Sequence, residues 1–224
     1  MNLSETLRLF ARWTVTLTPE QLARVERDVA VQHFTEGALV ARKGENVDHW
    51  IGVCAGLVKL TSTGPDGRAT TFTGVPPGGW FGEGSLLKEE PRRYDGIALS
   101  DCTVAKLPRA TFLWLLDSSI AFNRHLLIQL NERLAQFIGL VEYERLLDPD
   151  AKMARCIANL FNPTLYPGVG PKLEISQAEL AQLVGVSRQR ANQSLQALEK
   201  AGLLAVEYGG VRVLDLAGLG TYGA

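Results

Sequence analysis

The sequence predicts an α+β protein in which an N-terminal β-barrel of the jelly-roll type, a long helix and a C-terminal winged helix-turn-helix follow one another. Three patterns predict it: short β-rich segments between His33 and Pro108, a regular apolar seam after them, and two capped helices followed by a hairpin. The 224 residues are 46% apolar and 21% charged, which excludes a disordered or fibrous chain. We place the domains at residues 1–117, 118–147 and 148–224.

The first thirty residues predict helix. Thr18 can cap a helix, Pro19 suits its first position, and Gln21 stands where a capping box needs Glu or Gln. From His33 onward, segments such as WIGVCAGLVKLTST, ATTFTGV and IALSDCTVAKL alternate with Gly and Pro turns. Short strands with turn signals about every 8–12 residues are typical of a sandwich or barrel. Pro65-Asp66-Gly67 predicts a hairpin tip between two of them.

Residues 118–147 predict one long helix with a coiled-coil seam, because apolar residues are spaced alternately by three and four. The seam consists of Leu127, Leu130, Leu134, Phe137 and Val141. A second apolar face at Leu126, Ile138 and Leu140 indicates a second packing partner. We therefore predict a homodimer through this helix; the alternative is that the seam only packs on the barrel. Asp148 and Pro149 then predict the start of the next helix.

Residues 175–202 predict a helix-turn-helix. Ser176 and Glu179 form a capping-box pattern, Gly185 supplies the turn, Ser187 caps a second helix, and Gly202 ends it. At about 100° per residue, Ala191, Leu195 and Leu198 share one face of the second helix. A hairpin signal at Gly209-Gly210 follows, so that the whole module is winged.

The opposite face of the second helix carries side chains suited to reading DNA bases. Arg donates two hydrogen bonds to guanine, and Gln or Asn pairs with adenine. We predict this DNA-contacting set: Ser176, Gln177, Ser187, Arg188, Gln189, Arg190, Asn192 and Gln193. Residues 151–224 hold 7 Lys and Arg against 5 Asp and Glu, a mildly basic balance that does not oppose a double-stranded DNA partner. A solvated, Gln-rich face is the alternative.

The chain resembles the cyclic-AMP receptor/fumarate-nitrate reductase regulator (CRP/FNR) family of bacterial transcription factors. The resemblance covers almost the whole chain and is carried by Gly44-Glu45, Gly56, Phe81-Gly82-Glu83, the long helix and ISQAELAQLVGVSRQRANQSLQALEKAGLL. It implies a cyclic-nucleotide-binding-type barrel, a dimer, effector-controlled DNA binding, and RNA polymerase as a partner if the protein activates. It also implies that Arg188, Gln189 and Gln193 contact bases. Since two of these are Gln, the family's usual operator is not assumed.

The resemblance also implies an effector site after Trp80. A cyclic-nucleotide pocket needs backbone N–H groups, an Arg for the phosphate and a carboxylate for the ribose. We predict these effector-binding residues: Gly82, Glu83, Gly84, Ser85, Arg93 and Tyr94. The alternative is a structural Glu83–Arg93 ion pair in a vestigial pocket of an effector-independent regulator.

Several residues depart from a cyclic AMP site. Tyr94 stands where the family has a small hydroxyl residue, and Asp95 adds an anion on the same face if the segment is a strand. Phe137 and Ile138 replace the helix hydroxyls that contact cyclic AMP. We therefore expect a nucleotide-like small effector other than cyclic AMP, and no certain cofactor.

Other classes of protein fit the sequence less well. Three dispersed cysteines, Cys54, Cys102 and Cys156, do not match a disulfide framework or a four-cysteine iron–sulfur site, and we predict buried thiols. His33, His49 and His125 show no haem or cupin-type metal pattern. A metalloenzyme or a purely nucleotide-binding module would leave the helix-turn-helix unexplained. We expect no catalytic site, no metal, no membrane association and a cytoplasmic location.

Overall fold

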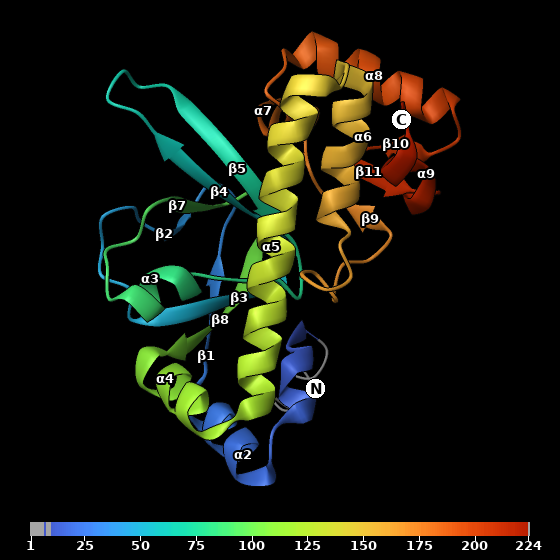
Figure 1. Ribbon diagram of the computed structural model, residues 1–224. Helices are drawn as coiled ribbons and strands as arrows, with labels where there is room; N and C mark the ends of the chain where they lie inside the picture. Colours follow the sequence, from blue (N-terminus) through green and yellow to red (C-terminus); the bar gives the residue numbers. More distant parts are fainter. Residues whose placement is uncertain (1–6, 8–9, 224) are drawn as a thin grey trace.

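The N-terminal domain is built from two antiparallel sheets flanked by helices, and the long helix α5 runs from it to the C-terminal domain (Figure 1). This computed structural model describes residue 7 and residues 10–223. The predicted α+β class and the jelly-roll arrangement are confirmed, although the strands form two packed sheets rather than a closed barrel. No helix in the described part of the chain is long and apolar enough to cross a membrane.

The N-terminal domain begins with helical segments, as predicted from Thr18. The 3₁₀ helix η1 spans Arg12–Thr16, and α2 spans Pro19–Asp28 with a complete capping box between Thr18 and Gln21. One sheet has the order β1-β8-β3-β6 and the other β2-β7-β4-β5. Their strands are β1 (Ala30–Phe34), β2 (Leu39–Ala41), β3 (His49–Ala55), β4 (Val58–Thr63), β5 (Ala69–Val75), β6 (Trp80–Phe81), β7 (Asp95–Ala98) and β8 (Cys102–Pro108).

Two apolar clusters hold this domain together. One lies between the sheets and includes Val53, Leu60 and Val104, all at most 4% exposed. The other covers the outer face of the first sheet, where the tilted rings of Trp50 and Trp80 pack with centroids 4.4 Å apart. Helices α4 (Arg109–Ser118) and α5 (Ile120–Leu146) close this second cluster through Phe112 and other apolar side chains. The α3 helix (Glu83–Lys88) follows β6 directly.

The C-terminal domain is the predicted winged helix-turn-helix. Asp148 caps α6 (Pro149–Leu160), and helices α7 (Gln177–Val184) and α8 (Arg188–Lys200) pack on it. Strands β10 (Leu204–Glu207) and β11 (Gly210–Val213) form the wing, with β9 (Lys172–Leu173) beside β11 and α9 (Leu216–Thr221) at the end. The wing turns at Tyr208-Gly209, one residue earlier than predicted, because the positive φ of Gly209 falls at the second turn position.

The loop 161–171, which follows α6, ties the two domains together. Leu165 and Tyr166 are buried in the apolar cluster between the sheets of the N-terminal domain. The amide of Gly168 donates to the carbonyl of Pro77 at 3.1 Å, and a Cβ on Gly78 would lie 2.5 Å from the Gly168 nitrogen. The glycine at position 78 therefore allows the loop to approach the β5–β6 connection closely.

Candidate nucleic-acid interface and effector pocket

Helices α7 and α8 are positioned by their caps and by one buried face. The side chains of Ser176 and Ser187 accept hydrogen bonds from the amides of Glu179 and Arg190, and so satisfy the N-termini of the two helices. Gly185 ends α7 in a left-handed conformation. Ala191, Leu195 and Leu198 are fully buried, as the periodicity predicted. The N-terminal turn of α8 is thereby held at the surface.

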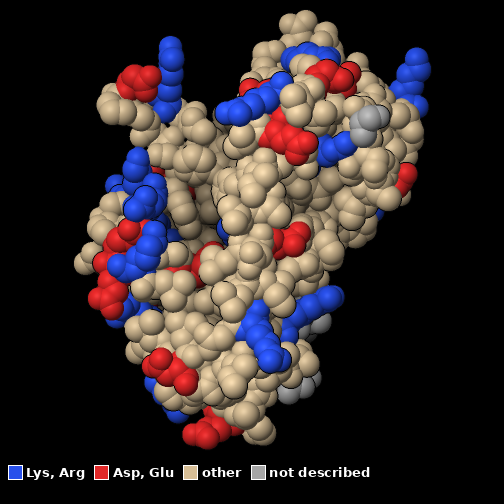
Figure 2. Space-filling model, viewed as in Figure 1, with Lys and Arg blue, Asp and Glu red and all other residues tan. Residues whose placement is uncertain are grey.

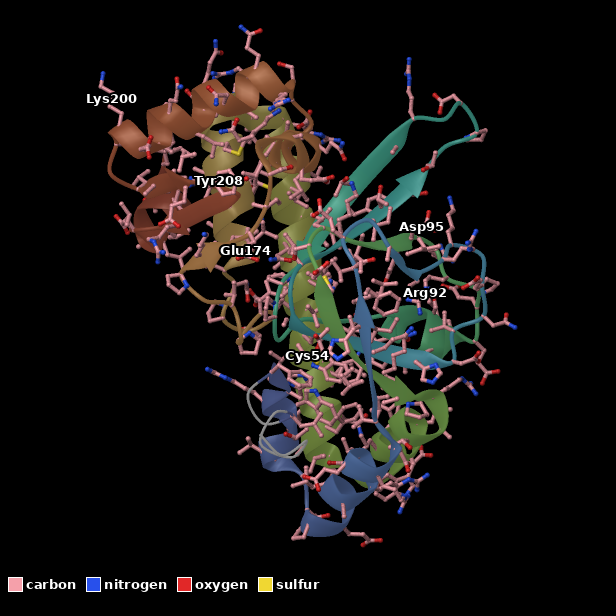
Figure 3. All side chains as sticks on the ribbon, turned by 180° about the vertical axis from the view of Figure 1, so that it is seen from behind. Cys54, Arg92, Asp95, Glu174, Lys200 and Tyr208 are labelled. Carbon is pink, nitrogen blue, oxygen red and sulfur yellow. The ribbon has the colours of Figure 1, made fainter. Side chains whose placement is uncertain are left out.

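The exposed face of α8 gathers most of the predicted DNA-contacting residues. Gln177, Arg188, Gln189, Asn192 and Gln193 surround one shallow recess. Within it, the amide of Asn192 donates to the Gln177 side-chain oxygen at 3.0 Å. The recess therefore presents one guanidinium group and several amides to a ligand. The far end of the helix, at Lys200, points into solvent (Figure 3).

Two charged residues of α8 contact neighbouring elements of the C-terminal domain instead of lining the recess. Arg190, one of the predicted DNA-contacting residues, pairs with Asp150 of α6 at 2.8 Å and is only about one-third exposed. Glu199 accepts the backbone N–H of Val206 at 2.8 Å and so joins α8 to the wing. Among the described residues, Arg188 at the start of α8 therefore has no acidic partner, whereas Arg190 has one.

In the N-terminal domain, Glu83 is the first residue of α3 and is buried, with 5% of its surface exposed. The indole of Trp50 donates to one Glu83 oxygen at 3.4 Å, and the Arg133 Nε lies 3.7 Å from the other, an ion pair too long for a hydrogen bond. Arg133 also donates to the Trp80 carbonyl at 2.9 Å. Burial lowers the pKa of Arg133, but Glu83, Tyr166 and Tyr94 together have the larger effect, so that this pKa lies above its ordinary value.

The structure separates the two adjacent arginines of this region. Arg93, the predicted phosphate ligand, is 70% exposed and forms a paired contact with Glu90, with both bonds at 2.9 Å. Arg92 is buried instead, and burial lowers its pKa. A Cβ on Gly82 would lie 3.0 Å from the Arg92 Nη1, an atom that has no hydrogen-bond partner among the described residues. Glu83 therefore pairs with Arg133, and the Glu83–Arg93 ion pair considered as the alternative does not form.

Tyrosines fill the space around these charges. Burial raises the pKa of Tyr94 to about 12, and Glu83 adds to the shift, while Arg133 and Arg92 oppose it. The Tyr94 ring lies 6.5 Å from that of Phe81. Tyr166, from the loop 161–171, has a buried hydroxyl without a partner in the described part of the chain. Two hydroxyl groups and two guanidinium groups thus lie around the buried carboxylate of Glu83, while the exposed Glu45 also acts on Arg92.

The remaining predicted effector residues lie at the edge of this group. Gly82 adopts a positive φ of 99° as the N-cap of α3, and Gly84 and Ser85 follow in its first turn. Ser85 donates to the Pro91 carbonyl at 3.4 Å. The Asp95 carboxylate accepts a hydrogen bond from the Lys43 backbone amide at 2.7 Å. In Figure 3, Arg92 and Asp95 lie on the segment that enters β7.

The predicted seam of α5 is largely exposed. Leu127, Leu134, Phe137 and Val141 are 59, 56, 41 and 55% exposed, whereas Leu130 packs against the N-terminal cluster. Ile138, on the second predicted face, is also 60% exposed. The surface over the middle of α5 is mostly uncharged (Figure 2). Exposed apolar side chains in a continuous row are typical of a face that binds another protein.

The described residues contain no cluster of three or more His, Cys, Asp or Glu side chains that could hold a metal ion. The three thiols are unpaired in the structure; Cys102 and Cys156 are buried and Cys54 is half-buried. Burial raises the pKa of Cys54 and of Cys156 to about 12. The thiols are therefore neutral near pH 7 and poor nucleophiles.

Sequence reasoning missed Arg92, Arg133 and Tyr166. Residues 91–94 are irregular, so that strand alternation could not decide which of two adjacent arginines turns inward. Arg133 follows Leu130 by three residues, and this spacing puts both on one face of the helix. The spacing was therefore the signal that could have predicted an inward position for Arg133. Tyr166 carried no local signal, because a loop has no periodicity.

Comparisons with known proteins match both halves of the chain. Residues 31–119 match the family described as cyclic nucleotide-binding domain, and residues 151–222 match the Crp-like helix-turn-helix domain. The chain is 29% identical to a cyclic AMP receptor protein from Thermus thermophilus, covering 88% of this chain and 91% of that protein. It is 31% identical to the transcriptional regulator SdrP of the same organism, covering 75% and 80%.

Solved structures agree with the fold. A transcriptional regulator of the CRP/FNR family, also from Thermus thermophilus, is 28% identical and aligns with a TM-score of 0.59 over 85% of this chain and 96% of that chain. FixK2 from Bradyrhizobium japonicum, at 16% identity, aligns with a TM-score of 0.71 over 88% and 98%. The order of domains in these proteins is the order found here.

Proposed function

The chain belongs to the CRP/FNR family of transcriptional regulators, and from this premise we propose that it binds a palindromic DNA operator as a homodimer under the control of a small anionic effector. The observation that carries the proposal is the face of α8, where Arg188, Gln189 and Gln193 lie exposed beside one another. A helix of this kind enters the major groove with its N-terminal residues on the base edges.

Dimerisation is proposed from the exposed seam of α5. The residues at 127, 134 and 141 repeat every seven positions and are each more than half exposed. Such a repeat buries its apolar side chains when it meets a second copy of itself. A two-fold dimer then requires half-sites about one helical turn, or roughly 34 Å, apart. If the protein activates transcription, RNA polymerase is a further partner.

The effector class follows from the charges around Glu83. Arg92 and Arg133 place two guanidinium groups near the buried Glu83 carboxylate, and the exposed Glu45 also acts on Arg92. Arg92 Nη1 and Arg133 Nε have no hydrogen-bond partner among the described residues. A guanidinium group can donate two parallel hydrogen bonds to the oxygens of a phosphate or carboxylate. These unpartnered, buried guanidinium nitrogens support a small anion, of the nucleotide type or simpler, and Tyr94 and Tyr166 supply hydroxyl donors.

Cyclic AMP itself is not the proposed effector. Phe137 and Ile138 cannot supply hydrogen bonds to an adenine amine, and each unsatisfied buried polar group costs about 1–3 kcal/mol. The Asp95 carboxylate accepts a hydrogen bond from the Lys43 backbone amide, and a neutral donor of this kind does not cancel the repulsion between a carboxylate and a phosphate. The case against cyclic AMP therefore depends on both α5 and β7.

The proposal is tested by enriching random DNA on the full-length protein, with and without a metabolite extract. We expect a palindromic consensus whose recovery changes with the extract. Enrichment without any consensus would refute sequence-specific binding, and a consensus indifferent to every extract would refute effector control. A salt titration of the mobility shift then counts the phosphate contacts.

A further inference from the structure

The first helix of the helix-turn-helix, α7, is bonded to the N-terminal domain through one lysine. The Lys59 ammonium group on β4 donates to both carboxylate oxygens of Glu179 at 2.9 Å and to the side-chain oxygen of Gln182 at 3.2 Å. Only 12% of the Lys59 side chain and 23% of the Glu179 side chain are exposed. Among the described residues, these are the hydrogen bonds that join the N-terminal sheets to α7.

An apolar contact between the domains lies beside this ion pair. Gly74 of β5 is directly opposite Lys59 in the β4–β5 ladder, and a Cβ on Gly74 would lie 2.9 Å from the Leu160 Cδ2 of α6. Leu57 belongs to the apolar cluster of the C-terminal domain. Apolar attraction is non-directional, so it holds the domains together without fixing their relative position. The Lys59 hydrogen bonds depend on distance and angle, and they therefore fix where α7 lies.

A hinge for the C-terminal domain lies between α5 and α6. These helices are joined by Leu147 and Asp148, which are both extended, and hinges are typically a few residues at the ends of elements. Side-chain bonds join α5 to α6 at Gln136–Asn159 and Glu144–Lys152, each 2.9 Å long. Those bonds reach α6, whereas Lys59 bonds α7 itself. A small turn about the hinge therefore moves α7 and α8 unless Lys59 holds them.

The position of α7 also sets the position of the recognition helix. The two helices share one apolar cluster, through Leu180 of α7 and Leu195 of α8, so they move as a unit. Figure 1 shows α8 at the C-terminal end of α5. In the proposed dimer the two-fold axis follows α5, so a shift of α8 occurs in both copies and changes the separation of the two recognition helices. One base pair between half-sites corresponds to about 3.4 Å along the DNA and about 35° of rotation around it.

We propose that Lys59 is a positioning residue for DNA recognition: by holding Glu179, it fixes the separation of the two recognition helices and so determines which half-site spacing the dimer accepts. This inference rests on the proposed homodimer and its palindromic operator. It divides recognition between the domains, because α8 reads the bases and a lysine of the N-terminal domain sets the distance between the two readings. Lys59 acts through Glu179 and not through a contact with DNA.

The spacing test uses the full-length protein and the operator recovered by enrichment, with its half-sites moved together or apart by one or two base pairs. Competition binding gives the ratio of affinities for the recovered and the altered spacings, a ratio that does not depend on the fraction of protein that is folded. Lys59→Met should lower this ratio about tenfold, the bias that one hydrogen bond to a charged group exerts. Base preferences within each half-site should stay unchanged.

Matched variants separate positioning from charge and from folding. Glu179→Gln should relax the spacing preference as Lys59→Met does, and the combined variant should add little to either. Lys59→Arg keeps a cationic donor and should retain the preference. Lys43→Met is the control, because Lys43 bonds Ser62 within the N-terminal domain, and it should leave the ratio unchanged. An unchanged ratio in Lys59→Met, an equal loss of affinity at every spacing, or the same relaxation in Lys43→Met would each overturn the proposal.

A second measurement needs no DNA. Spin labels at Arg42→Cys, where the arginine is 64% exposed in the N-terminal domain, and at Lys200→Cys at the end of α8 report the distance between the domains by pulsed electron paramagnetic resonance. The labelled protein is diluted with unlabelled protein so that one chain is measured at a time. We expect Lys59→Met to broaden the distance distribution. Equal widths would overturn the positioning role even if no operator is recovered, whereas enrichment without a consensus would refute the proposed DNA recognition and leave this measurement valid.

Discussion

Lys59 of β4 donates to both carboxylate oxygens of Glu179 at 2.9 Å, and so joins the N-terminal domain to the first helix of the helix-turn-helix. The two side chains are 12% and 23% exposed, and Lys59 also contacts the Gln182 oxygen at 3.2 Å. Glu179 was expected to complete a capping box with Ser176. The Glu179 carboxylate instead accepts hydrogen bonds from Lys59 of the N-terminal domain, and Ser176 alone caps the helix.

Lys59→Met should destabilise the protein by about 1–3 kcal/mol, because it leaves the Glu179 carboxylate half-buried without its partner. Urea unfolding measures this change, and a double-mutant cycle with Glu179→Gln isolates the pair. Lys43→Met is the control, since Lys43 bonds an exposed Ser62 hydroxyl within one domain. Equal losses for the two lysine variants would contradict a special role for the interdomain pair.

Arg188→Ala should cost about 1–3 kcal/mol of DNA binding and relax discrimination at one position in each half-site. Competition binding with operators that differ at single bases measures this. The matched variant is Arg190→Ala, which removes the bond to Asp150 and should lower stability while leaving the base preferences unchanged. A uniform weakening across all operators by Arg188→Ala would identify Arg188 as a phosphate contact.

The combined replacement of Leu127, Leu134 and Val141 by Ala should produce a monomer in sedimentation velocity. Each truncation removes a side chain that is exposed in one chain and buried in the dimer, at about 2–5 kcal/mol if burial is complete. Leu130 is left intact because it packs within its own chain. Leu146→Ala serves as the control, at a residue 73% exposed beyond the seam. A triple variant that stays dimeric would place the interface elsewhere.

Thr111→Val should reduce stability at pH 7 by more than it does in acid. The Thr111 hydroxyl donates to Asp28, and this bond, helped by Arg27 and Arg24, lowers the pKa of Asp28 below 3.8. A lowered carboxyl pKa contributes stability that is present above the unfolded value of about 3.9 and is lost as pH falls through the folded value. The gap between the variant and the unmodified protein should therefore close below about pH 4.

Denaturant unfolding across this pH range measures the effect. Ser118→Ala is the control, because the Ser118 hydroxyl donates to the Trp114 carbonyl, which does not titrate. Its effect on stability should not vary with pH. A gap for Thr111→Val that persists unchanged in acid would show that the hydroxyl acts through packing alone.

Micromolar cyclic AMP should leave operator affinity unchanged, because Phe137 and Ile138 offer no hydrogen bonds to the adenine amine. Two unsatisfied polar groups weaken a ligand by more than tenfold. Calorimetry and a mobility shift check this directly. A tight isotherm together with stronger operator binding would contradict it and would assign the contacts to Tyr94, Tyr166 or the partner subunit.

Local patterns predicted the parts of the fold that depend on local chemistry. The caps at Thr18, Asp148, Ser176 and Ser187 and the buried face of α8 follow from neighbouring residues, and each is confirmed. The two-residue strands β6 and β9 escaped prediction because they exist only through pairing with distant strands. Contacts such as Lys59 with Glu179, which lie 120 residues apart, leave no periodic trace in the sequence.

The candidate sites also differ in how far the sequence could predict them. The base-reading face was predictable because one regular helix carries it, whereas the charged group around Glu83 draws on α3, an irregular segment, α5 and a loop. Only three-dimensional packing decides that Arg92 is buried and Arg93 exposed. Similarly, the edge-to-face contact of Trp13 with Trp80 joins residues more than sixty positions apart in the sequence.

The burial of Leu165 and Tyr166 in the other domain's core has a consequence for building chimeric regulators from this chain. A boundary drawn at residue 147 gives a sensor fragment whose apolar interior lacks two side chains, and a DNA-binding fragment that exposes them to water. Cavities and exposed aromatic surface of this kind destabilise both products. A transplanted sensor would need its native loop 161–171, or a recipient whose loop offers side chains of matching shape.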